Sequence, residues 1–89
     1  MNWKNAIALS AQDARQAHSS AEESRTRAAE CTELARQAVE ADEGEYWTAR
    51  AEILRNEAES FGAHAARLDA LVEQARRALE RHGGDASSS

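Results

Sequence analysis

The chain has 89 residues, a net charge of −5, no proline and few aromatic residues, and alanine supplies about a quarter of it. This composition is typical of long helices and coiled coils, because alanine, glutamate and arginine favour helices and no proline interrupts them. The acidic balance argues against direct nucleic-acid binding, and no run approaches the ~20 apolar residues that a membrane-spanning helix needs.

The first predicted helix covers residues 2–41 and carries a heptad repeat, abcdefg, built of small residues. A stripe at positions a and d packs along its whole length against another helix. The stripe consists of Ile7, Ser10, Ala14, Ala17, Ala21, Ser24, Ala28, Cys31, Ala35 and Ala38. The only cysteine, Cys31, lies on it, so we expect a buried, reduced thiol in a cytoplasmic protein.

A break is predicted at residues 42–45, where Gly44 suits the left-handed position that ends many helices. The second predicted helix covers residues 45–81 and has large residues at most d positions. Together the two helices form one domain, residues 1–82. Residues 83–89 have no apolar side chain larger than alanine and are expected to form a disordered tail.

A short turn near Gly44 forces the helices to run antiparallel, and its position sets their register. In that register Ala28 faces Phe61 and Ala21 faces Leu68, so each large residue meets a small one. His18 then lies opposite Asp69, and Gly62 lies opposite Arg25, for which it leaves room. The predicted core contains Ala21, Ala28, Ala35, Trp47, Leu54, Phe61, Leu68 and Val72.

No constellation for catalysis or metal binding is apparent. His18 and His64 lie on opposite edges of the seam and cannot converge within one hairpin. Cys31 has no basic neighbour on its own face to activate it, and there is no glycine-rich phosphate loop. The chain is therefore interpreted as a protein that is not an enzyme and that has no cofactor and no metal ion.

Large apolar residues also occur outside the seam, on the side formed by heptad positions c and g. The opposite side, formed by positions e and b, is mostly charged or small. Because two helices alone bury little surface, we expect the c and g side to pair with another chain. The predicted interface residues are Leu9, Leu34, Tyr46, Ile53 and Leu71.

The sequence thus predicts an all-α fold, an antiparallel two-helix coiled-coil hairpin with an alanine-rich seam. We expect two hairpins to pair into a homodimeric four-helix bundle. The leading functional interpretation is a small acidic adaptor, regulator or inhibitor that binds another protein. One alternative is a self-assembling structural unit. Another is a phage-type inhibitor whose acidic surface occupies the basic nucleic-acid site of an enzyme, by analogy of charge and size.

Overall fold

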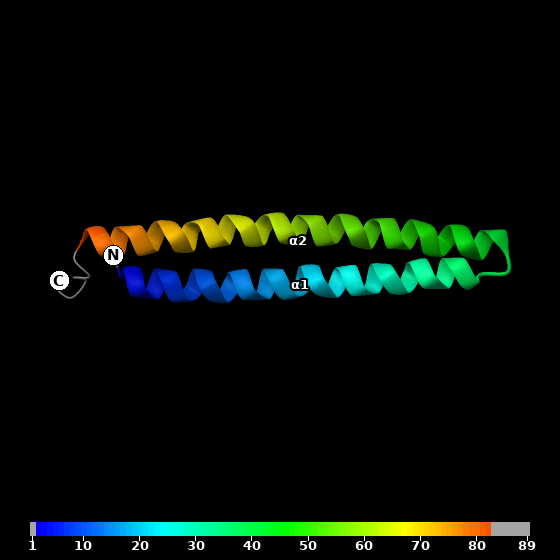
Figure 1. Ribbon diagram of the computed structural model, residues 1–89, viewed down its shortest axis with the longest axis horizontal. Helices are drawn as coiled ribbons and strands as arrows, with labels where there is room; N and C mark the ends of the chain where they lie inside the picture. Colours follow the sequence, from blue (N-terminus) through cyan, green and yellow to red (C-terminus); the bar gives the residue numbers. More distant parts are fainter. Residues whose placement is uncertain (1, 83–89) are drawn as a thin grey trace.

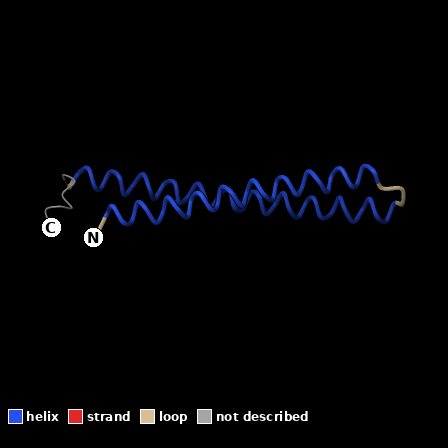
Figure 2. The backbone as a smooth tube through the Cα atoms, turned by 90° about the horizontal axis from the view of Figure 1, so that it is seen from below, coloured by secondary structure: helices blue, strands red, loops and turns tan. Residues whose placement is uncertain are grey.

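The computed structural model describes residues 2–82, which form two long antiparallel helices, α1 (Trp3–Gln37) and α2 (Ala41–Arg81). The helices lie side by side along a rod of 68 × 13 × 13 Å, with the connection at one end (Figure 1). In the perpendicular view they overlap at mid-length (Figure 2). The predicted all-α hairpin is confirmed. Among the described residues, neither helix has a segment long and apolar enough to cross a membrane.

The outer ends of both helices are closed by local hydrogen bonds. The Asn5 amide donates to Asn2 Oδ1 at 3.0 Å, so Asn2 is the N-cap of α1. At the end of α2 the His82 amide donates to the Ala78 carbonyl at 3.1 Å. These bonds satisfy backbone groups that a helix end otherwise leaves without a partner.

The seam between the helices is built mainly of alanine. Ala65 is 0% exposed, Ala21 and Ala51 are 1% exposed, and among residues 2–82 no large side chain is fully buried. Small residues at the contact let helices approach closely, because the interaxial distance follows side-chain size. Within residues 2–82 no buried side-chain nitrogen or oxygen lacks a hydrogen-bond partner. The seam is therefore thin, but its buried polar side-chain atoms all have hydrogen-bond partners.

The turn lies earlier than predicted. Residues 38–40 leave the helical conformation, and Gly44 is part of the first turn of α2, where its amide donates to the Glu40 carbonyl at 3.1 Å. Ala38 and Glu40 are extended, so no left-handed glycine is needed to reverse the chain. Asp42 and Glu43 occupy the first turn of α2, where the helix dipole favours carboxylates. The predicted helix boundaries at residues 41 and 45 are therefore wrong, and the predicted tail, residues 83–89, lies outside the described residues.

The register is displaced by one heptad from the predicted one. Ala28 and Cys31 share a buried cluster with Ala51 and Leu54, whereas the predicted register places Ala28 against Phe61. Both seams repeat every seven residues, so a shift of one heptad keeps large residues opposite small ones. The earlier turn selects this shifted pairing. The predicted neighbours His18 and Asp69 are nevertheless in contact, with Nε2 2.9 Å from Oδ2.

Four of the eight predicted core residues are buried, three are half-buried and one is exposed. Ala21, Ala28, Leu54 and Val72 are buried. Ala35, Trp47 and Leu68 are half-buried. Phe61 is 38% exposed, and the expectation that it belongs to the core is wrong. Helices held together by alanine leave little space for a phenyl ring between them, so this ring lies at the edge of the seam.

Gly62 does not make room for Arg25, contrary to the sequence-based expectation. A methyl group built at Gly62 would meet no atom within 4 Å. Because glycine in a helix interior costs ~1 kcal/mol relative to alanine, Gly62→Ala is expected to raise the free energy of unfolding by about 0.5–1 kcal/mol. Thermal and urea denaturation followed by circular dichroism measure this change.

The exposed neighbour Ala63 provides the matched control. Ala63→Gly is expected to lower the free energy of unfolding by a similar ~1 kcal/mol, since it introduces the same backbone entropy cost. A Gly62→Ala protein that is less stable than the parent would show that this glycine has a packing role after all.

Candidate protein-interaction surface

One long side of the hairpin carries large apolar side chains that are exposed. We call it the apolar face and define it by the five residues at heptad positions c and g that were predicted as an interface. Their exposed fractions range from 41% for Leu34 to 59% for Ile53. The structure leaves all of them on the surface: Leu9, Leu34, Tyr46, Ile53 and Leu71.

Near the turn the apolar face is reinforced by aromatic packing. The rings of Tyr46 and Trp47 have centroids 4.9 Å apart and meet edge to face at 78°. Trp47 packs against the buried cluster of the seam, so it anchors the first turns of α2. The Tyr46 hydroxyl accepts a hydrogen bond of 3.5 Å from Arg50 Nη1. Tyr46 is thereby held in place while its ring remains 56% exposed, which reduces the entropy lost when it is covered.

Phe61 extends the apolar face toward the middle of the rod. A hollow of about 300 Å³ lies beside its ring and is lined by Ile53, Asn56, Glu57 and Ser60. Sequence reasoning assigned Phe61 to the core because it occupies a d position. The signal that could have placed it outside was its size, since the facing seam offers only alanine, serine and cysteine for most of its length. Phe61 and the hollow therefore belong to the candidate surface.

Val39 is the second apolar residue that the sequence analysis missed. It lies in the turn and is 95% exposed. The predicted first helix included it, so it was not considered as a surface residue. Its β-branched side chain, followed by three acidic residues within the next four positions, was the available sign of a helix boundary.

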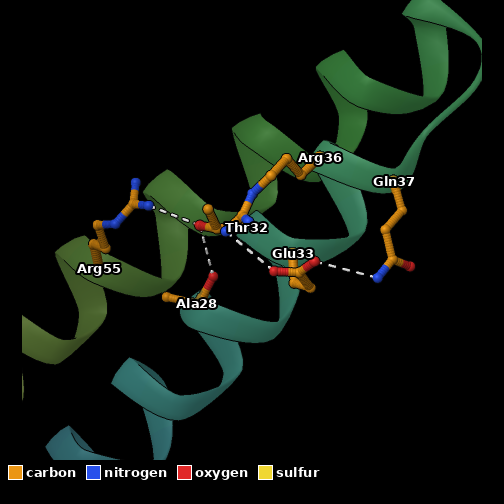
Figure 3. A network of polar contacts seen from close by, with 6 residues as sticks. All are labelled: Ala28, Thr32, Glu33, Arg36, Gln37 and Arg55. Atoms are coloured by element: carbon orange, nitrogen blue, oxygen red, sulfur yellow. Dashed lines mark hydrogen bonds and ion pairs between the residues drawn. The ribbon is translucent and has the colours of Figure 1, made fainter.

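The opposite side of the rod joins the two helices through polar contacts, and we call it the polar flank. His18 contacts Asp69 as described above, and Arg55 Nη2 donates to Thr32 Oγ1 at 2.8 Å. Thr32 in turn donates to the Ala28 carbonyl at 3.0 Å (Figure 3). The polar flank is thus occupied by contacts between the two helices, whereas the five side chains of the apolar face are 41–59% exposed.

Charged side chains on α1 beside the polar flank are also engaged locally. Glu33 accepts from Arg36 at 3.1 Å and from Gln37 at 3.2 Å (Figure 3). An open hollow of about 610 Å³ lies next to this network. It is lined by Arg25, Ala28, Ala29, Thr32, Glu33, Arg36 and Arg55. Arg36 and Arg55, which line this hollow, already have polar partners within the hairpin. The hollow is therefore a weaker candidate for a binding site than the apolar face.

The only cysteine, Cys31, is a free, buried thiol in the seam. Within residues 2–82, no group of three or more histidine, cysteine or acidic side chains is arranged to hold a metal ion. Comparisons with protein-family models, with curated proteins and with solved structures found no match to this chain.

Proposed function

We propose that this protein is a non-enzymatic interaction module that binds another protein chain through its apolar face. The observation that carries this proposal is the row of exposed residues from Tyr46 and Leu34 to Leu71 and Leu9 on one side of a two-helix rod. Single exposed apolar residues are ordinary, but a row on one side of a helical hairpin is typical of a surface that another protein covers.

The shape of the rod supports the same proposal. The chain exposes 6368 Å². A compact monomer of its mass, 9.7 kDa, exposes about 5,100 Å². The excess of about 1,270 Å² follows from the elongated shape and is larger than the ~800 Å² that each partner contributes to a standard protein interface. Covering one side of the rod would therefore remove much of this excess.

The charge pattern favours apolar contacts over acidic mimicry. Three glutamates on the surface pair with arginines on the same helix, in the pairs Glu23–Arg27, Glu33–Arg36 and Glu73–Arg77. Acidic and basic residues alternate in this way along most of the rod, and the exception is the turn, where Glu40, Asp42, Glu43 and Glu45 have no basic residue between them. Aromatic and aliphatic anchors also dominate binding energy in most interfaces, whereas charges at the rim contribute little.

Affinity capture with a tagged chain in the source cell tests this function. The tagged protein is expected to co-purify in stoichiometric amount with a second chain, identified by mass spectrometry. The double variant Tyr46→Ala with Ile53→Ala is expected to lose that chain, because it removes two central anchors without touching the seam. Its helicity, measured by circular dichroism, should equal that of the parent.

The matched control replaces two exposed residues beside the polar flank, Glu52→Ala with Glu59→Ala. Co-purification is expected to persist in this control, since the apolar face is unchanged. Capture that survives the loss of Tyr46 and Ile53 would place the binding surface elsewhere and contradict the proposal.

A further inference from the structure

We infer that the partner on the apolar face is a second copy of this chain, lying antiparallel across a twofold axis near Phe61. This inference rests on the proposed function, because it uses the same face, and it names the occupant. It rests on the positions of the apolar and charged residues along the rod. In this arrangement the apolar residues of one copy meet those of the other, and charges of opposite sign face each other.

The apolar residues of the two helices are centred at the same height. On α2, Ile53 and Leu71 lie on either side of Phe61, about 12 and 15 Å away at a rise of about 1.5 Å per residue. The cluster of buried residues sets the height of α1 against α2, because it places Ala28 level with Leu54 and Cys31 level with Ala51.

In that alignment Leu34 lies level with Thr48, between Tyr46 and Ile53, and Leu9 lies level with Glu73, beside Leu71. The midpoint between Leu9 and Leu34 therefore falls within about one helical turn of the level of Phe61. Ile53 and Leu71 on α2 and Leu9 and Leu34 on α1 therefore share a centre near Phe61.

A twofold axis at this centre brings apolar residues together in layers. Phe61 meets Phe61 of the second copy. Leu71 of one copy lies against Ile53 and Leu34 of the other, and Leu9 lies against Tyr46. The hollow beside Phe61, with its volume of about 300 Å³, lies between the first two layers and leaves space for side chains of the second copy. Every large residue of the apolar face is covered in this arrangement, as an isologous interface requires.

The charges between these layers favour the antiparallel arrangement over the parallel one. Antiparallel pairing places Glu57 opposite Arg67 of the second copy, and Arg50 within about one helical turn of Asp13. Parallel pairing would place each of these charges opposite its own copy, which costs free energy. All four side chains are exposed, and none of them forms an ion pair within residues 2–82.

Light scattering and spin-label distances test this inference on the full chain. A dimer is expected at micromolar concentration. In a Cys31→Ala background, single labels are introduced by Gln74→Cys on α2 or by Gln37→Cys on α1, both at exposed c positions. Antiparallel pairing predicts distances between copies of at least about 36 Å for position 74 and about 45 Å for position 37. Circular dichroism of each labelled variant checks that the hairpin is intact.

Three results would overturn the inference, and they are distinguishable. Distances below about 20 Å at both positions would indicate parallel pairing, since each site then faces its own copy. A monomer that captures a different protein through Tyr46 and Ile53 would refute self-pairing and leave the proposed function standing. A monomer that captures nothing would refute both proposals.

Discussion

Replacing Ala65 by leucine is expected to lower the free energy of unfolding by about 1–3 kcal/mol or more, because the added methyl groups overpack the seam. Ala65 is 0% exposed and lies in the middle of α2. An alanine-rich seam holds two backbones close together, so a larger side chain must push the helices apart along several turns. Urea denaturation followed by circular dichroism measures the loss.

Ala63→Leu is the matched control, since Ala63 lies on the exposed side of the same helical turn. Leucine and alanine have similar helix propensities, so this variant is expected to stay within about 0.5 kcal/mol of the parent. An Ala65→Leu protein with unchanged stability would mean that the helices are not held in close contact at this point.

Introducing glutamate at Leu34 and Ile53 together is expected to separate the chain from its partner on the apolar face. Each residue is a predicted anchor of the interface. Loss of an anchor costs about 2 kcal/mol or more of binding free energy, which corresponds to a dissociation constant about 30-fold larger. A carboxylate buried without a partner adds a further desolvation cost. For the proposed homodimer, light scattering at micromolar concentration should change from the mass of two chains to the mass of one.

The hairpin itself should survive this double substitution, because Leu34 and Ile53 are 41% and 59% exposed and lie outside the seam. Circular dichroism should therefore report an unchanged helix content. The control Ala29→Glu with Ala66→Glu adds the same charge at exposed positions on the opposite side and should leave the assembly intact. If the glutamates at positions 34 and 53 left the mass unchanged, the interface would have to lie elsewhere on the rod.

The candidate surface could be predicted in outline from the heptad positions. Leu9, Leu34, Tyr46, Ile53 and Leu71 occupy positions c and g, and the structure exposes all five. Their side of the helix follows from spacing alone, because residues three, four and seven apart share a face. Phe61 and Val39 could not be found in this way. The exposure of Phe61 depends on how closely α1 approaches α2, and that of Val39 depends on where α1 ends.

The sequence by itself determined the class of fold, the antiparallel direction of the helices and the small residues that line the seam. These features depend on local periodicity and helix propensity, to which every heptad contributes. It also indicated the contact between His18 and Asp69, which the structure confirms at 2.9 Å.

Only the tertiary structure decided the turn at residues 38–40, the register in which Ala28 packs with Leu54, and the outward position of Phe61. The physical reason is the repeat itself. When both helices repeat every seven residues, pairings one heptad apart bring similar side chains together, and local patterns cannot distinguish them. The energies of the turn and of the whole seam, summed over both helices, select one register.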